Sequence, residues 1–545
     1  MKNSLQFILA ISLLLLPLFQ LPAQSLEQQL DRILAEYVSP STPGVTALVA
    51  KEGKILFRKS RGMSNLEFNT PMQSEQIFRI GSLTKQFTAT AILKLAEENK
   101  LSLQDDIRRY IGDFLPGGAP ISIENLLTHT SGIKNYTQIA NWEKAVEQTD
   151  LSPEQLIDIF KNEPLAFQPG EQFMYSNLGY NLLGYIIESV SGLPFANYLQ
   201  QTFFTPLGMQ QTSYATPQTT HIQGYSKRNG HYSEAADLDM KLPYAAGGLL
   251  SSVDDQLTWY QAIFDHKVLQ EASLERAHRA FLLKNGRPIP YGYGWRIGSI
   301  QGAPSIKHDG IINGFVTFVI YLPVQQIFVA LFSNCDCHVD IEEPASKMAA
   351  VMLGKPYENQ SVQLSQQELM AFQGIYQSPE GHEKYITFQD GQLMYHDKGG
   401  SKVPLLAVAD GQFTIGESLT FLTFSGEAAE KNIIFTMEST GLPTQWRRVA
   451  DIPTAFQSIS MSSQNVEKFL GKYQFPGAFT LEVTRSDDKI YGQVGPDKKE
   501  IRPFEKDKFF AVDTDIKLIF DMNTNGDVSG LTLVQNMEMQ AKKIE

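Results

Sequence analysis

The 545-residue sequence has very few cysteines, only Cys335 and Cys337. A disulfide framework therefore does not build the fold, and a bond between two cysteines one residue apart would close a strained ring. We expect two packed thiols at the end of a strand, with a metal site completed by His338 as the alternative.

The sequence also lacks an excess of positive charge. It contains 46 Lys and Arg against 59 Asp and Glu, a formal net charge of −13. Proteins that bind the phosphate backbones of nucleic acids typically carry positive charge, so we predict no nucleic-acid partner. His-Glu-x-x-His, Walker and Gly-x-Gly-x-x-Gly motifs do not occur, and the sequence predicts no metal and no other cofactor.

Long hydrophobic runs are missing beyond the N-terminus. There, Lys2 precedes an apolar run from Phe7 to Phe19, followed by Leu21-Pro22-Ala23. This pattern is typical of a secretory signal peptide, which we assign to 1–24. The run is shorter than the ~20 apolar residues of a membrane span, although an uncleaved anchor is the alternative. We expect an exported bacterial protein, periplasmic or secreted, with no stable membrane span after signal cleavage.

The overall composition is typical of a large globular protein. Hydrophobic residues make up 42 % and charged residues 19 %, and the length predicts about three domains. Short β-rich runs at 45–50 and 54–58, and again at 315–322 and 327–332, flank a mostly helical middle. A sheet built from both ends of one segment predicts an α+β domain over 26–352.

The C-terminal remainder consists of short alternating strands and contains an internal repeat. Phe372–Gln377 resembles Phe469–Gln474, 97 positions later, whereas Phe435 matches Phe520, 85 positions later. We therefore expect two copies of a small all-β, barrel-sized module with a length change in the middle. The predicted modules span 368–450 and 466–545.

Ser82 is the candidate nucleophile. Of three Ser-x-x-Lys matches, only Ser82-Leu83-Thr84-Lys85 opens a long apolar helix. A serine hydroxyl needs a base within hydrogen-bond reach, and residues three apart share one helix face. The alternative is a helix N-cap, but a capping box would place Glu or Gln at position 85. A lysine in the first turn faces the positive end of the helix dipole, which lowers its pKa as a base requires.

Two further patterns follow in order, Tyr175-Ser176-Asn177 and His308-Asp309-Gly310. A tyrosine near a lysine ammonium can be held partly as phenolate, and an asparagine can bond a substrate amide carbonyl. Gly310 would let a substrate backbone lie against a strand edge. Taken singly, each has a structural explanation: a core aromatic, a turn residue and a surface histidine.

The order of these motifs resembles the serine β-lactamase and penicillin-binding-protein superfamily, in its class C-related branch of D-aminopeptidases, D-alanyl-D-alanine carboxypeptidases, esterases and β-lactamases. The resemblance covers most of 26–352. It implies an antiparallel sheet flanked by helices with a helical subdomain. The flanking segments that share it are Phe78–Ser82, Leu126–Gly132, Phe167–Gly170, Pro206–Met209 and Gly247–Leu249.

The resemblance also implies roles for individual residues. Ser82 would be acylated, and Lys85 and Tyr175 would share the proton transfers, with the principal base left open. Substrate-binding groups would come from Asn177, His308, Gly310 and Ile311, the last forming the oxyanion hole through its backbone N–H together with that of Ser82. The C-terminal modules resemble lipocalin-like domains, and we expect at least one to pack on the catalytic domain.

These features predict a serine hydrolase that forms an acyl-enzyme with an amide or ester, peptides containing D-residues being candidate substrates. In the penicillin-recognising proteins that this sequence resembles, a lysine at the position of His308 would hold a substrate carboxylate. Histidine is mostly neutral at pH 7, which disfavours a β-lactamase or D-Ala-D-Ala carboxypeptidase. The alternatives are a β-lactamase or D-Ala-D-Ala carboxypeptidase, and a catalytically silent protein that recognises cell-wall peptide or a partner. The expected partner is a small-molecule or peptide substrate, and a homo-oligomer is left open.

Overall fold

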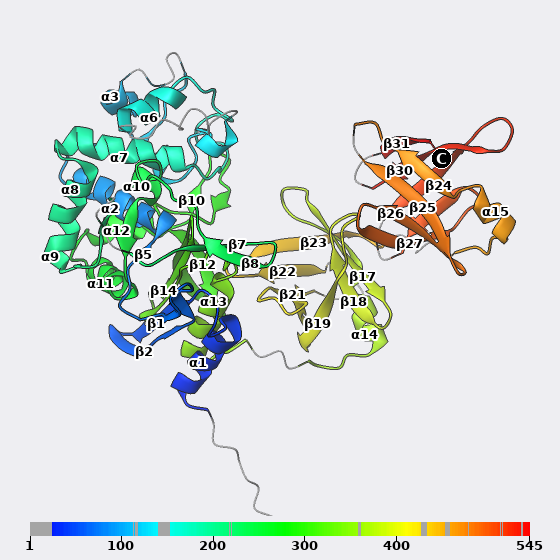
Figure 1. Cartoon of the computed structure of the whole chain (residues 1–545), viewed down its shortest axis with the longest axis horizontal. Coiled ribbons are helices and arrows are strands. Elements are labelled where there is room, and N and C mark those ends of the chain that lie inside the picture. Colours follow the sequence, from blue (N-terminus) through cyan, green and yellow to red (C-terminus); the bar gives the residue numbers. More distant parts are fainter. Residues whose placement is uncertain are drawn as a thin grey trace, which may run out of the picture.

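The computed structural model describes residues 24–544 except 113, 115–117, 140–152, 217–218, 220, 358–360, 427–432, 453–457, 478, 513, 515 and 536–537. The expected signal peptide lies outside the described residues but for its last position. Three units follow one another along the long axis: a mixed domain with a six-stranded sheet, then two closed barrels (Figure 1). Among the described residues, no helix has both the length and the apolar character needed to cross a membrane.

The sheet of the first unit is antiparallel throughout, with strand order β12-β13-β14-β15-β1-β2. Strand β1 pairs with β15, so the two ends of the domain meet in one sheet as predicted. The predicted hairpin turn at Glu52-Gly53 has φ of 51° and 76°, the left-handed values of a two-residue hairpin loop. The strands are β1 Val45–Lys51, β2 Lys54–Arg61, β12 Arg296–Ile300, β13 Ala303–Ile312, β14 Phe315–Leu322 and β15 Ile327–Ser333.

Both faces of this sheet are covered. Val316, Phe318 and Ile320 of β14 share a core with α1 and α13, while Val319 and Tyr321 face the core of the helical part. Burial on both faces explains why β14 and β15 are continuous hydrophobic runs. Shorter strands of this domain are β3 Met63–Asn65, β4 Thr70–Pro71, β5 Phe78–Arg79, β6 Ser213–Tyr214, β7 Tyr225–Arg228, β8 His231–Glu234, β9 Leu249–Ser251, β10 Phe281–Leu282 and β11 Pro288–Ile289.

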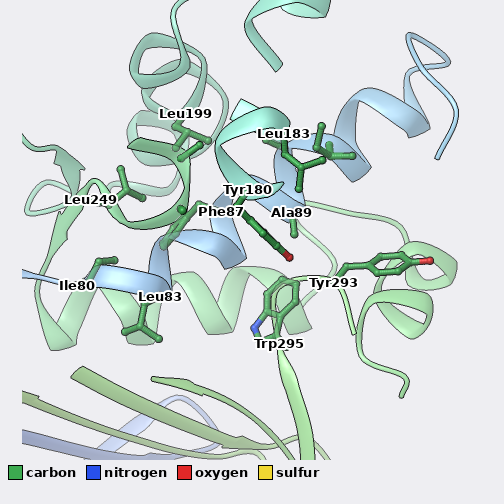
Figure 2. Close-up of a cluster of buried hydrophobic side chains, with 14 of the residues drawn as sticks. Ile80, Leu83, Phe87, Ala89, Tyr180, Leu183, Leu199, Leu249, Tyr293 and Trp295 are labelled. Atoms are coloured by element: carbon green, nitrogen blue, oxygen red, sulfur yellow. The ribbon is translucent and has the colours of Figure 1, made fainter. Parts of the chain in front are cut away.

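Helix α2 runs through the centre of the helical part. Its side chains Phe87 and Ala89 lie among Tyr180, Leu199 and other apolar groups from distant segments (Figure 2). The helix is buried on nearly all sides although its sequence is not apolar all round, because Thr84, Lys85, Gln86, Thr88 and Thr90 are buried with the apolar side chains. The helices are α1 Leu26–Tyr37, α2 Thr84–Glu97, α3 Arg108–Ile111, α4 Ile123–Leu127, α6 Pro153–Phe160, α7 Asn177–Ser191, α8 Phe195–Leu199, α9 Thr205–Leu207, α10 Tyr244–Gly247, α11 Val253–Phe264, α12 Glu271–Ala277, α13 Glu342–Met352, α14 Gln366–Ala371 and α15 Ser463–Glu467.

Each C-terminal module is a closed barrel of eight antiparallel strands, so the predicted α+β domain with two all-β modules is confirmed. The first barrel comprises β16 Gly374–Gln377, β17 Glu383–Gln389, β18 Gln392–His396, β19 Val403–Ala409, β20 Gln412–Ile415, β21 Phe421–Ser425, β22 Ile434–Glu438 and β23 Thr444–Ala450. The second comprises β24 Gly471–Gln474, β25 Thr480–Ser486, β26 Lys489–Val494, β27 Asp497–Pro503, β28 Lys508–Ala511, β29 Lys517–Met522, β30 Val528–Val534 and β31 Glu538–Lys543.

The repeat is visible in equivalent contacts. The Tyr376 hydroxyl donates to the Phe372 carbonyl (2.8 Å), and the Tyr473 hydroxyl donates to the Phe469 carbonyl (2.7 Å). The predicted length change is wrong, because Phe435 lies on the seventh strand of its barrel and Phe520 on the sixth. By strand order the partner of Phe520 is Phe424, 96 positions earlier, which is close to the offset at the start of the modules.

Cys335 and Cys337 are joined by a disulfide, so the expectation of free thiols is wrong. The chain bends after β15, and the two Cα atoms lie 5.1 Å apart, within the usual range for a disulfide. The Nδ1 atom of His338 is hydrogen-bonded to Ser333 Oγ at 2.7 Å. The alternative of a metal site is therefore not supported.

The first barrel packs on the mixed domain, as expected of at least one module. The turn between β22 and β23 places Thr440 and Gly441 so close to Gly298 of β12 that a Cβ at 298 would lie 2.1 Å from the Thr440 oxygen. The Thr440 hydroxyl also donates to Glu342 Oε1 of α13 at 2.5 Å. Because β12 is the edge strand of the sheet, this contact protects an otherwise open edge.

Candidate active site

Ser82 lies in the 3₁₀ turn Gly81–Leu83 that leads directly into α2. Leu83 is the N-cap residue of α2 and provides no side-chain cap, so Ser82 does not serve as the helix cap. Gly81 has φ of 50°, and a Cβ there would lie 3.1 Å from the Ile311 nitrogen. The nucleophile turn therefore packs tightly against β13, and this close approach requires glycine at 81.

Lys85 is fully buried beneath Ser82, one turn along the helix. Its Nζ lies 3.0 Å from Ser82 Oγ, 2.7 Å from Asn177 Oδ1 and 2.8 Å from the carbonyl oxygen of Ala246. Burial lowers the pKa of the Lys85 amine well below its usual range, and the Arg296 charge lowers it further while Asp309 opposes. The structure thus favours a neutral amine at this position.

A neutral amine has two hydrogens and one lone pair. The Asn177 and Ala246 oxygens can only accept, so they take the two hydrogens. The lone pair is then left for the third neighbour, the hydroxyl of Ser82. This arrangement is the geometry that a general base needs toward the proton it removes.

Tyr175 lies on the other side of Lys85, with the Lys85 Nζ 4.8 Å from its ring centre. Burial raises the pKa of the Tyr175 phenol far above its ordinary value, and a hydrogen bond with Ser82 opposes the shift only in part. The expectation of a partial phenolate is wrong, because the neighbouring lysine is itself driven toward neutrality. Tyr175 is a neutral phenol within reach of the nucleophile.

Asn177 begins α7, one residue after the N-cap Ser176. Its Oδ1 accepts from Lys85, and its side chain is also hydrogen-bonded to Tyr136. The backbone N–H of Asn177 donates to Asn135 Oδ1 at 3.3 Å. The residue therefore ties α7 to the wall of the pocket and fixes the direction of the lysine amine.

His308 differs from expectation. Its ring is fully buried: Nδ1 lies 2.6 Å from the Asp309 carbonyl and must donate, so Nε2 accepts from the Tyr291 hydroxyl at 2.8 Å. Burial lowers the pKa of His308 to about 4. Both ring nitrogens have hydrogen-bond partners inside the protein. The imidazole therefore supports β13 from the protein interior and is not placed to contact a substrate.

Gly310 and Ile311 lie next to the nucleophile turn. A Cβ at Gly310 would lie 2.0 Å from the Ile80 oxygen, so the glycine is required by the nucleophile segment rather than by a substrate strand. Ile311 pairs with Val316, one step from the pair Ile312–Phe315 that closes the turn. Alternate pairs of an antiparallel ladder are not hydrogen-bonded, which directs the Ile311 N–H away from β14 and toward the pocket.

The structure therefore brings all seven residues singled out in the sequence close together at one site. It also adds Arg296 of β12, whose guanidinium lies 2.9 Å from Asp309 Oδ1 with its side chain 41 % exposed. Tyr291 and His129 join the buried aromatic groups behind Tyr175. Arg296 and Tyr291 come from a five-residue strand and the loop before it, which carry no periodic signal in the sequence. Among the described residues, no group of three or more His, Cys, Asp or Glu could hold a metal ion.

Comparisons with known proteins identify relatives of this chain. Residues 27–347 match the model of the Beta-lactamase family, and residues 455–545 match a domain of unknown function, DUF3471. Penicillin-binding protein 4* of Bacillus subtilis (strain 168) is 28 % identical over 425 residues, covering 71 % of this chain and 92 % of that protein. The D-aminopeptidase of Gluconobacter oxydans (strain 621H) is 27 % identical over 342 residues, covering 61 % of this chain and 63 % of its own.

Solved structures show the same likeness. The octameric penicillin-binding protein homologue from Pyrococcus abyssi has a TM-score of 0.54 and 25 % identity, covering 78 % of this chain and 99 % of its own. The D-amino acid amidase from Ochrobactrum anthropi SV3 with L-phenylalanine has a TM-score of 0.54 at 23 % identity, covering 60 % and 98 %, and shows the shared fold alone. The family model covers more than half of the chain, and the chain therefore belongs to the beta-lactamase family of serine hydrolases.

Proposed function

We propose that this protein is an exported hydrolase that forms an acyl-enzyme on Ser82 with an amide or ester substrate. The observation that carries the proposal is the environment of Lys85, whose two acceptor-only neighbours leave its lone pair for the Ser82 hydroxyl at 3.0 Å. The apolar run at residues 7–19 supports export, since it has the length of a signal-peptide core.

The mechanism follows from the positions of the groups. Lys85 takes the Ser82 proton as Oγ bonds to the carbonyl carbon, and the carbonyl oxygen becomes an oxyanion that the Ser82 and Ile311 N–H groups stabilise. The proton passes from Lys85, through the neutral phenol of Tyr175, to the leaving amine or alcohol as its bond to carbon breaks. Water then attacks the ester carbon and gives one proton to the same groups. That proton returns to Ser82 Oγ as the bond between Oγ and the carbonyl carbon breaks, which releases the acid product.

The substrate class rests on the charge balance beside β13. His308 is neutral, and the guanidinium of Arg296 nearby is paired with Asp309. The surroundings of His308 and Arg296 favour a substrate without a free carboxylate next to the reacting bond. Amides and esters of D-amino acids fit, in keeping with the D-aminopeptidase among the similar proteins.

A second candidate is a substrate that does carry a carboxylate, such as a β-lactam or a D-alanyl-D-alanine peptide. The partial exposure of Arg296 favours it, because a carboxylate could share the guanidinium with Asp309.

Intact-mass measurement tests these proposals. Wild type and Ser82→Ala are incubated with a fluorophosphonate and with D-amino-acid amides, esters and β-lactams. We expect one fluorophosphonate adduct on wild type, none on Ser82→Ala, and transient acyl adducts from amides or esters. Acyl adducts from β-lactams alone would favour the second candidate. No labelling of wild type, under conditions that label a related hydrolase, would favour a catalytically silent binding protein.

A further inference from the structure

His129 lies directly behind Tyr175, in the segment that follows α4. It is 1 % exposed and has φ of 56°, a left-handed conformation that is uncommon for residues other than glycine. A buried titratable side chain held in an unfavourable backbone conformation needs a compensating role.

The polar atoms of His129 accept hydrogen bonds from the N–H groups of the two residues next to Tyr175. The Met174 N–H donates to the His129 carbonyl oxygen at 2.9 Å, and the Ser176 N–H donates to His129 Nδ1 at 3.1 Å. Because Nδ1 accepts, the ring is neutral with its hydrogen on Nε2. Burial lowers the pKa of His129 well below its usual range, which is consistent with this tautomer.

The ring itself packs on the phenol. Its centre lies 4.2 Å from that of Tyr175, 4.8 Å from that of Tyr291 and 4.9 Å from that of Tyr180. Within the described part of the chain, the buried Nε2 atom has no hydrogen-bond partner. An N–H group enclosed by aromatic rings makes only weak contacts with them, so burying the His129 ring here costs free energy.

Closing α4 does not require this side chain. The Thr130 N–H donates to the Asn125 carbonyl at 2.9 Å, and the Thr128 hydroxyl donates to the Glu124 carbonyl at 2.8 Å. These bonds satisfy the end of the helix without the imidazole. Closing the helix therefore does not account for the contacts of the His129 side chain.

We propose that His129 is a positioning residue, which fixes the Tyr175 phenol against Ser82 and Lys85 by holding the N–H groups of both neighbouring residues and one face of the ring. The proposal rests on the proposed function, because it assumes that Tyr175 takes part in the proton transfers. It predicts that His129 acts on the reaction through Tyr175 alone.

Two substitutions isolate the Nδ1 contact. Asparagine tolerates positive φ and places Oδ1 where His129 has Nδ1, whereas glycine tolerates positive φ but provides no acceptor. We expect His129→Gly to lower kcat for an ester substrate by about 100-fold with KM changed by less than about threefold. His129→Asn should recover at least about a tenth of the wild-type kcat, because it restores the bond to Ser176.

The decisive readout is a double-mutant cycle with Tyr175→Phe, with the folded fraction of each variant measured by active-site titration. If His129 acts through the phenol, His129→Gly changes the rate by less than about threefold in the Tyr175→Phe background. An equal loss in both backgrounds, or no loss in wild type, would overturn the proposal. Should the glycine variant fail to fold, His129→Gln, whose carbonyl lies one bond further out, takes its place. Absence of Ser82 labelling in wild type would instead count against the proposed function.

Discussion

Lys85 and Tyr175 share one pocket, and burial moves their pKa values in opposite directions. It lowers the pKa of the amine and raises that of the phenol, so both groups are driven toward their neutral forms. The sequence spacing predicted that Ser82 and Lys85 meet, but it left the principal base open. The geometry favours Lys85, because a phenol that stays protonated is a poor proton acceptor.

Tyr175→Phe tests the role of the phenol. We expect kcat/KM to fall by about 100-fold, since the substitution removes one proton-transfer group and leaves Lys85 in place. Tyr180→Phe is the matched control, because Tyr180 lies in the same cluster but its hydroxyl donates to the Leu127 carbonyl. The control should cost about 1 kcal/mol of stability with little change in kcat/KM. Equal kinetic losses in the two variants would show that Tyr175 only packs.

At the scale of elements, the active site depends on how closely β13 approaches the nucleophile turn. Gly81 faces Ile311, and Gly310 faces Ile80, so two glycines allow the two backbones to touch. Both glycines were visible in the sequence. The reason for Gly310 was not, because the contact joins segments more than 200 residues apart.

Gly310→Ala should therefore separate β13 from the turn. We expect a loss of about 1–3 kcal/mol in the free energy of unfolding, together with a large drop in the rate of Ser82 labelling. Gly492→Ala in β26 is the matched control, since a Cβ there meets its nearest neighbour at an ordinary 3.4 Å. Denaturant unfolding and labelling kinetics measure both effects. A Gly310→Ala protein with wild-type labelling would contradict the close approach.

Particular elements show what sequence patterns can and cannot provide. The hairpins, the helix of Ser82 and the two β modules were predictable because each has a local periodicity or turn signal. The disulfide, the barrel register and the burial of His308 by Tyr291 were not, because each depends on where the chain bends or on a contact between separate loops. The match of Phe435 with Phe520 led to the wrong prediction of a length change, because core phenylalanines from different strands of a barrel cannot be distinguished in the sequence.

At the scale of the whole molecule, Glu342 links the barrel to the catalytic sheet. Its Oε1 accepts from Thr440 of the first barrel and from Lys307 of β13, both at 2.5 Å. The Lys307 side chain is only 5 % exposed, so its ammonium depends on this carboxylate. Lys307 directly precedes His308, which places the junction one residue from the active-site strand.

Glu342→Gln should lower the free energy of unfolding of the catalytic domain by about 2 kcal/mol, because it leaves a buried ammonium without its counter-charge. The neighbouring Glu343→Gln is the control, since its ion pair with Lys347 is exposed and worth less than about 1 kcal/mol. Thermal and denaturant unfolding of both variants provide the comparison. Equal effects would mean that Lys307 does not need Glu342.

Removal of residues 366–545 should leave Ser82 reactive, because every group of the pocket lies before residue 312. It should also uncover the edge strand β12, and we expect a change in substrate range or a tendency to associate. Labelling and size-exclusion chromatography of the truncated protein measure these outcomes. A truncated protein that is folded but does not react would show that the barrels complete the site.

The pH dependence of Ser82 acylation tests the central claim most directly. A base with a lowered pKa is unprotonated and active above that pKa, and it becomes protonated and inactive as the pH falls through it. The wild-type labelling rate should therefore already be at its plateau at a pH well below the ordinary lysine pKa of about 10.4. Lys85→Met should lower the plateau by about 1,000-fold and abolish this dependence. A wild-type rate that rises only near pH 10, or a Lys85→Met protein that labels as fast as wild type, would contradict the account.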